Sequence, residues 1–203
     1  IWKKKKIFFF LGGTSKEKKI SLKTGKSCIL ALKKIGFQVI KFDPKFLSLN
    51  EIHKYKADVI FNALHGKDGE DGKVQSFFEY FKIPYTHSGV LSSMIAMNKH
   101  LSKQLFIKNE VRTPNYFFLN RCDYLSVNLN NKIKKSKISF PIVVKPNDEG
   151  SSIGVKICHN FISLKKEFKK LKKNYNNLIF EEYIPGKEIQ VAVKGGKSIG
   201  AIE

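Results

Sequence analysis

Residues 141–155 of the chain read PIVVKPNDEGSSIGV, and this stretch decides how the second half of the protein folds. It predicts a strand that ends at Lys145, then a loop rich in glycine and serine, then a second strand. Successive backbone N–H groups and the two serine hydroxyls can close over phosphate oxygens, and the Lys145 ammonium adds a point charge for them. The pattern is neither GxGxxG nor a P-loop, in which GKS or GKT opens a helix. The alternative is an ordinary hairpin turn in which Gly150 and Gly154 supply positive φ angles.

The first half of the chain alternates strand and helix signals. Apolar runs at 7–11, 37–42 and 59–64 predict strands, and helices are expected from Ser21 to Gly36 and over Val74–Phe81. This alternation predicts an α/β fold with a parallel sheet. Glycine-rich turns follow the first and third strands, and in such sheets ligands gather at the carboxyl ends of the strands. The apolar residues of the second helix, Phe77 among them, are expected to pack in the core.

After Met97 the strand and helix signals in the sequence no longer alternate regularly. A helix is expected from Lys99 to about Lys108, followed by a boundary at Thr113–Pro114 and a polar surface segment at 120–137. Beyond it we expect strands at 142–145, 155–157, 178–183, 189–193 and 198–202, and a lysine-rich helix at 163–173.

The charge of the chain excludes some classes of function. The formal net charge is +21, but only two of the 38 basic residues are arginines, and the lysines are scattered along the whole chain. Specific nucleic-acid binding is therefore not expected, because base and phosphate recognition favours arginine. No apolar run approaches the roughly 18–20 residues of a membrane span, so we expect no membrane association and a cytoplasmic location. The three widely spaced cysteines predict reduced, packed thiols.

Residues 63–72, ALHGKDGEDG, place His65 among glycines and carboxylates at the end of a predicted strand. This combination suits a site for a small zwitterion, and His65 is its candidate functional residue. The alternative is a solvated acidic loop in which Glu70 and Asp71 are structural, with Asp71 at the positive end of the next helix.

Two further segments carry candidate ligands. Residues 11–17 end in Glu17, whose carboxylate is expected to face a ligand ammonium group; the alternative is a surface glutamate beside a capping Thr14 or Ser15. Residues 180–188 combine a strand with an extended link whose backbone groups can bind a purine edge. Glu188, at the end of this segment, can accept hydrogen bonds from ribose hydroxyls. A core strand with exposed glutamates is the alternative there.

Taken together and in this order, the segments resemble the D-alanine–D-alanine ligase family of the ATP-grasp superfamily. The resemblance covers essentially the whole chain in one register. The matching segments are LGGTSKEKKISL (11–22), ALHGKDGEDGKVQ (63–75), IPYTHSGVLSSMIAMNK (83–99), VVKPNDEGSSIGV (143–155) and FEEYIPGKEIQVAV (180–193).

The family implies a three-domain fold. Residues 1–97 would form the N-terminal α/β domain, 98–180 the small α+β domain of the ATP-grasp fold, and 181–203 the start of its large domain, most of which is absent. ATP would phosphorylate one D-alanine, and the amine of a second would attack the acyl phosphate, giving D-alanyl-D-alanine for peptidoglycan synthesis. The family is usually dimeric, so a homodimer is expected.

By the same resemblance, each candidate residue acquires a role. Lys99 and Lys145 would contact the ATP phosphates, with Ser151 and Ser152 in the loop that closes over them. The adenine and ribose contacts would come from Glu181, Ile184 and Glu188. Glu17, linked to Ser151 by hydrogen bonds, would bind the ammonium group of the first D-alanine, and His65 would lie beside that substrate.

The chain also departs from the family pattern. Asn98 replaces the usual Asp before the ATP lysine, and His87 replaces a glycine, where a side chain could crowd the substrate loop. The chain begins with Ile1 and stops at Glu203 inside an apparent strand, so we expect a fragment. The resemblance implies Mg²⁺ (or Mn²⁺), with its ligands beyond Glu203, and we expect the 203 residues alone to be inactive.

Two alternative functions remain open from the sequence. A sister ligase of the same superfamily would make D-alanyl-D-lactate or D-alanyl-D-serine. A non-catalytic basic protein on the same fold would show salt-sensitive nucleic-acid binding and no chemistry that depends on ATP.

Overall fold

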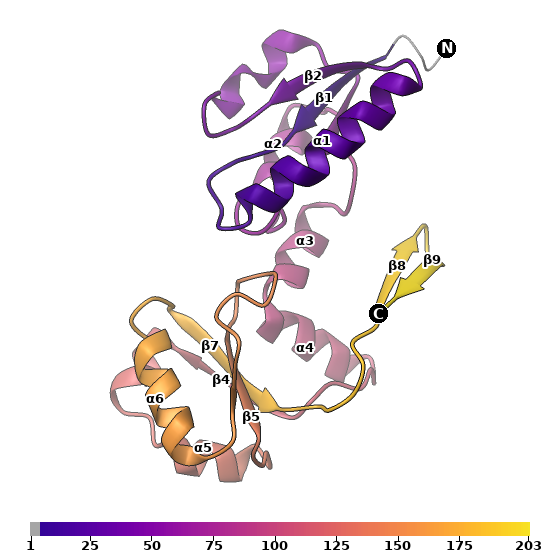
Figure 1. The fold of residues 1–203 in the computed structure, drawn as a ribbon. Helices are drawn as coiled ribbons and strands as arrows, with labels where there is room; N and C mark the ends of the chain where they lie inside the picture. Colours follow the sequence, from indigo (N-terminus) through magenta and orange to yellow (C-terminus); the bar gives the residue numbers. More distant parts are fainter. Residues whose placement is uncertain (1–4) are drawn as a thin grey trace.

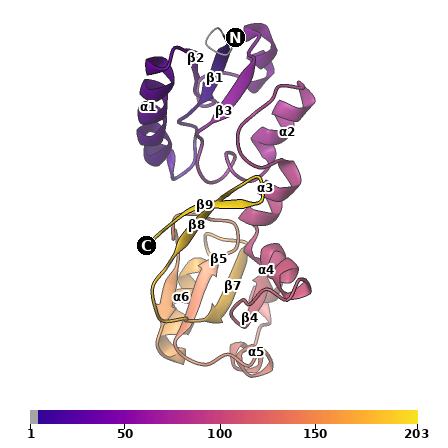
Figure 2. The same cartoon turned by 90° about the vertical axis from the view of Figure 1, so that its right-hand side faces the viewer.

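The computed structural model describes residues 5–203, apart from the side chain of His53, and arranges them as two bodies joined through helix α3 (Val90–Met97) (Figures 1 and 2). The N-terminal body contains a parallel sheet in the order β2-β1-β3, as its alternating sequence predicted. Its elements are β1 (Lys6–Phe10), α1 (Lys18–Lys34), β2 (Gln38–Phe42), the 3₁₀ helix η2 (Leu49–Tyr55), β3 (Val59–Asn62) and α2 (Lys73–Tyr80).

The core of this body is aromatic because β1 is buried on both faces. Phe8 and Phe10 lie on one face, where Phe10 packs edge-on against Phe78 of α2 with ring centroids 4.9 Å apart. Phe9 lies on the other face, against Ile29 of α1. A run with no polar position is typical of such a strand, and all three phenylalanines are fully buried.

Helix α1 begins three residues earlier than the sequence predicted, and Ser21 is not its first residue. The Ser21 hydroxyl is fully buried, accepts the N–H of Gly12 at 2.8 Å and donates to the carbonyl of Ala63 at 2.6 Å. Ser21 therefore ties the helix to the ends of two strands, and this tie fixes the loop between β1 and α1 over the sheet.

The second body has an antiparallel sheet in the order β4-β7-β5-β6, with helices packed on it. It also contains the strand β4, which was not predicted from the sequence. Its elements are α4 (Lys99–Lys108), β4 (Tyr116–Asn120), the 3₁₀ helix η3 (Arg121–Leu125), α5 (Leu129–Lys135), β5 (Ile142–Pro146), β6 (Lys156–Cys158), α6 (Phe161–Leu171) and β7 (Asn177–Glu182).

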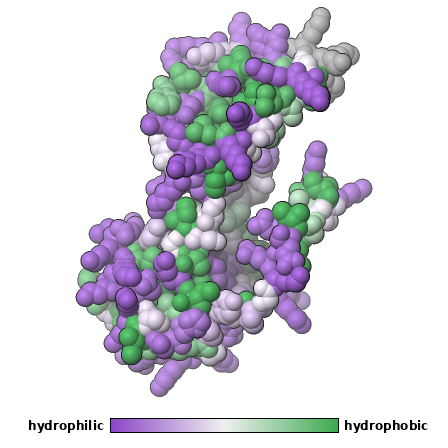
Figure 3. Space-filling view, viewed as in Figure 1, coloured by the Kyte–Doolittle hydropathy of each residue, from purple (hydrophilic) through white to green (hydrophobic). Residues whose placement is uncertain are grey.

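The remaining strands, β8 (Gln190–Lys194) and β9 (Lys197–Ile202), form an antiparallel hairpin. Every residue of both strands is exposed, and the hairpin projects beside the two bodies (Figure 1). Hydrophilic residues dominate the face of the molecule in Figure 3, with scattered apolar patches. Within residues 5–203, no helix combines the length and apolar character needed to cross a bilayer.

Candidate active site

A cavity of about 910 Å³ lies between the two bodies and is lined by both. The structure brings six of the candidate residues to its wall, namely His65, Lys99, Lys145, Ser151, Ser152 and Glu188. Glu17 lines an adjoining cavity of about 750 Å³. Neither cavity is lined by Ile184, which is exposed, or by Glu181, which is buried.

The two predicted phosphate-binding lysines share the larger cavity although they come from different elements. Lys99 is the first residue of α4, and Lys145 lies in β5. Asn147 joins the elements, because its carbonyl accepts the backbone N–H of Lys99 at 3.2 Å and its Oδ1 accepts that of His100 at 2.9 Å. Burial, and next the charge of Lys145, lower the pKa of Lys99. Two neighbouring ammonium groups in a half-buried cleft favour an anionic ligand.

Lys145 contacts Glu181 of the neighbouring strand through a short ion pair. The other carboxylate oxygen of Glu181 lies 2.9 Å from Nζ of Lys103, which is buried in α4. Both oxygens of Glu181 are thus held by lysines, and the residue is not part of the cavity lining. The sequence did not single out Lys103, since one lysine among many gives no local signal of burial.

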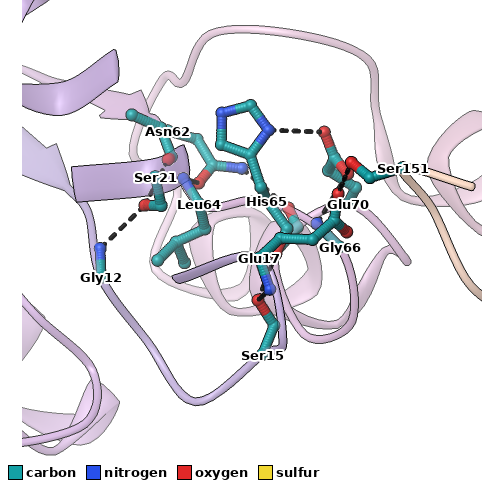
Figure 4. Close-up of polar contacts among 12 residues, drawn as sticks. Gly12, Ser15, Glu17, Ser21, Asn62, Leu64, His65, Gly66, Glu70 and Ser151 are labelled. Atoms are coloured by element: carbon teal, nitrogen blue, oxygen red, sulfur yellow. Dashed lines mark hydrogen bonds and ion pairs between the residues drawn. The ribbon is translucent and has the colours of Figure 1, made fainter. Parts of the chain in front are cut away.

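The Glu17 carboxylate lies where the two bodies meet, at the start of α1, and is 5% exposed. Ser151 donates a short hydrogen bond to its Oε1, and Figure 4 shows Ser151 reaching it from a separate part of the chain. A Cβ atom at Gly150 would lie 3.0 Å from Glu17 Oε2, so the absence of a side chain there permits the approach. The predicted link between Glu17 and Ser151 is thus present as a direct hydrogen bond.

The loop at 148–154 is held in an unusual backbone conformation. Ser151 and Ser152 have φ angles of 44° and 56°, in the left-handed region that non-glycine residues rarely adopt. Of the two glycines expected to supply positive φ, Gly154 does so at 75°, whereas Gly150 does not. The alternative of an ordinary hairpin turn with positive φ at both glycines is therefore met only at Gly154, because Ser151 and Ser152 take the left-handed positions. Such backbone outliers cluster at functional sites.

Lys16 fastens this loop to the N-terminal body. Its Nζ lies 2.7 Å from Glu149 Oε1 and donates to the hydroxyl of Tyr175 at 3.1 Å. The hydrogen bond to Glu149 is the main cause of the raised pKa of Lys16. Because Glu149 lies only two residues before Ser151, this ion pair helps to keep the loop closed over Glu17.

His65 follows β3 and is held by its backbone, since its carbonyl accepts the Ser15 hydroxyl at 2.7 Å (Figure 4). Its Nδ1 lies 3.7 Å from Glu70 Oε1, and Glu70 Oε2 accepts the N–H of Gly66 at 2.7 Å. Asp71 accepts the N–H of Lys73, the first residue of α2, at 3.3 Å. The two carboxylates thus make the structural contacts that the alternative interpretation of this loop expected.

The two departures from the family pattern have different surroundings. Asn98 caps α4, because its Oδ1 accepts the N–H of Leu101 at 3.0 Å, as an aspartate would. His87 has a φ of 80°, which explains why glycine suits this position, and its ring lies at the cavity wall. Its Nδ1 is 2.8 Å from the Thr86 hydroxyl, so the side chain occupies space that a glycine would leave open.

Comparison with known proteins gives consistent matches along the chain. Residues 45–88 match the family model for the D-ala D-ala ligase N-terminus, and residues 105–202 match the model for the D-ala D-ala ligase C-terminus. A D-alanine--D-alanine ligase of Pelagibacter ubique is 51% identical over 200 residues, covering 98% of this chain and 64% of that protein. The corresponding ligase of Fervidobacterium nodosum is 41% identical over 195 residues, covering 90% of this chain and 60% of that protein.

Solved structures agree with these matches. A crystal structure of D-alanine--D-alanine ligase from Bacillus anthracis superposes with a TM-score of 0.86 at 34% identity, covering 97% of this chain and 63% of that one. A second structure of the Bacillus anthracis ligase, complexed with ATP, gives 0.84 at 33% identity. The chain therefore spans slightly less than two thirds of the length of these relatives.

Proposed function

The chain belongs to the D-alanine–D-alanine ligase family, and on this premise we propose that the protein joins two D-alanine molecules in a reaction driven by ATP. The observation that carries the proposal is the shared cavity, where Lys99 and Lys145 lie with the loop of Ser151 and Ser152. Two cations and a loop of this kind suit the phosphates of a nucleotide. ATP is also the ligand named for the similar Bacillus anthracis structure.

In the proposed first step, a carboxylate oxygen of one D-alanine attacks the γ-phosphorus of ATP. The bond from that phosphorus to the bridging oxygen breaks, ADP leaves, and an acyl phosphate forms. Lys99 and Lys145 offset the negative charge on the transferring phosphoryl group. The buried Glu17 carboxylate binds the ammonium group of this D-alanine, and His65 lies beside it at the end of β3.

In the second step, the neutral amine of another D-alanine attacks the acyl carbon. The tetrahedral intermediate expels inorganic phosphate, the nitrogen loses a proton, and D-alanyl-D-alanine remains. The hydrogen bond from Ser151 to Glu17 couples closure of the loop to the site of the first substrate. Closure would exclude water, which otherwise hydrolyses the acyl phosphate.

The division of labour between domains is part of the proposal. Residues 1–97 would supply the site of the first D-alanine and 98–180 most of the phosphate site. The segment from 181 would provide the adenine and ribose contacts, through Ile184 and Glu188. We also propose a cytoplasmic homodimer that supplies peptidoglycan precursors.

Magnesium would neutralise phosphate charge in such a reaction. Within residues 5–203, however, no three His, Cys, Asp or Glu side chains gather in a way that could hold a metal ion. We therefore assign none of the described residues to the metal.

The test is the product formed by the complete protein that contains these 203 residues. With ATP, Mg²⁺ and D-alanine, mass spectrometry should detect D-alanyl-D-alanine and equimolar phosphate, and Lys145→Met should abolish both. Lys108→Met removes an exposed charge and serves as the matched control. Parallel reactions with D-serine and D-lactate identify a sister ligase, and an absence of any ATP-dependent product would refute the proposal.

A further inference from the structure

Lys103 is the most deeply buried charged group of α4 that the proposed mechanism does not use. Lys103 is 6% exposed and does not line the cavity between the two bodies. Its Nζ lies 2.9 Å from Glu181 Oε2, donates to Thr113 Oγ1 at 2.8 Å and to the Pro114 carbonyl at 3.1 Å. It also lies 4.9 Å from the centroid of the Tyr116 ring. These partners hold the Lys103 ammonium group beside Oε2 of Glu181, outside the lining of the cavity.

The three charged groups form a row that ends at the cavity. Lys103 binds one oxygen of Glu181, and Lys145 binds the other and faces the cavity. Lys145 thus has two tasks, because it neutralises a buried carboxylate and presents a charge to the nucleotide. A buried carboxylate left without a cation is strongly unfavourable. With only one lysine beside it, Glu181 would hold Lys145 back from a phosphate.

Lys103 would remove this conflict, because its charge would stay with Glu181 if Lys145 turned toward a phosphate. Burial lowers the pKa of Lys103, and its hydrogen bond to Glu181 opposes that shift, as expected of an ammonium that depends on its carboxylate. Lys99, four residues earlier on the same helix, lines the cavity directly. Helix α4 therefore carries one lysine that faces the cavity, Lys99, and one that pairs with Glu181, Lys103.

We propose that Lys103 is a positioning residue for Lys145: by sharing the charge of Glu181, it allows the Lys145 ammonium to turn toward the phosphates of a bound nucleotide. This inference rests on the proposed function, since it assumes that the cavity binds ATP. It assigns Lys103 no contact with substrate. Its consequence is that the competition between Glu181 and phosphate for Lys145 sets the affinity for ATP.

The test is a cycle of variants in the complete protein, with the dissociation constant of ATP measured by calorimetry. Lys103→Met leaves Glu181 with Lys145 alone and should weaken ATP binding at least about tenfold, as expected for a charged hydrogen bond. The double variant Lys103→Met/Glu181→Gln removes the competing charge and should recover most of that loss. Glu181→Gln alone should bind ATP at least as tightly as the wild type. Lys108→Met, an exposed lysine on the same helix, controls for the loss of one charge.

The outcomes separate the inference from the function on which it rests. A purely structural role for Lys103 predicts that the double variant binds ATP no better than Lys103→Met, and that Glu181→Gln weakens binding; either result would overturn the inference. An affinity for ATP in Lys103→Met equal to that of the wild type would also overturn the inference. If Lys103→Met does not fold, as thermal melting would show, Glu181→Gln alone still decides. If the wild type forms dipeptide but the cycle fails, only the inference falls; if the wild type binds no ATP, both fall.

Discussion

Replacing Gly66 with alanine should lower kcat/KM for the proposed ligase reaction by acting on Glu17, a residue 49 positions away. Gly66 has a φ of 69°, and a Cβ atom there would overlap Oε2 of Glu17, well inside the 3.0 Å that real contacts respect. The carboxylate must shift, and this shift disturbs the hydrogen bond that its Oε1 accepts from Ser151. A charged hydrogen bond contributes about 1.5–3 kcal/mol, which at about 1.4 kcal/mol per factor of ten corresponds to a loss of roughly 10- to 100-fold in kcat/KM.

Gly13 provides the matched control for backbone strain. Its φ is 76°, nearly that of Gly66, but a Cβ atom there would lie 3.4 Å from Leu64 Cδ2, an ordinary contact. Both alanine variants should lose about 1–2 kcal/mol of stability from the left-handed backbone, measured by urea unfolding. Only Gly66→Ala should lose activity, with a raised KM for the first D-alanine in a phosphate-release assay. Equal kcat/KM values in the two variants would refute the role given to the Glu17 carboxylate.

The other predictions concern charge, loop closure and packing. Because the pKa of Lys99 is lowered, Lys99 should lose its charge, and the protein its affinity for ATP, as the pH rises toward the ordinary lysine pKa of 10.5. Over the same pH range the contribution of Lys99 to the stability of the apoprotein should rise, because the unfolded chain binds more protons than the folded one. ATP titrations and urea unfolding at several pH values test the two effects. Lys16→Ala removes a partly exposed ion pair with Glu149 and should raise the KM for ATP only a few-fold, as expected for about 0.2–1 kcal/mol; a hundredfold rise would contradict this. Phe180→Ala removes a fully buried ring stacked on Phe117 at 4.5 Å and should lower the free energy of unfolding by about 3–5 kcal/mol, and a loss below 1 kcal/mol in denaturant melts would contradict the packing.

The sequence predicts those elements whose apolar pattern reflects complete burial. The predicted strands at 7–11 and 142–145 agree with β1 and β5 to within one residue at their ends. The agreement is close because a strand buried on both faces appears in the sequence as a continuous apolar run. Helix α3 was not predicted. Its N-terminus at Gly89 has no side-chain cap, and exposed Leu91 and Met94 blur the contrast between its faces.

The candidate site shows the same division. The glycine- and serine-rich composition of residues 148–154 indicated a candidate phosphate site, and the structure places Lys99 and Lys145 in one cavity with Ser151 and Ser152. The partners of Glu181 were not predictable, since burial of Lys103 arises from packing between α4, β4 and β7. Strand β4 was missed for a related reason. The proline at 114 suggested a boundary, whereas pairing with β7 makes the next residues a strand.

When the 203 residues are expressed by themselves, the hairpin of β8 and β9 should be the least stable part of the chain. Two strands alone are marginal in water, and all residues of this pair are exposed, including Val191, Val193 and Ile199. Its amide hydrogens should exchange with deuterium far faster than those of β1, whose three phenylalanines are fully buried. A protease added at low concentration should therefore cut first in this part of the chain, and leave the two bodies intact.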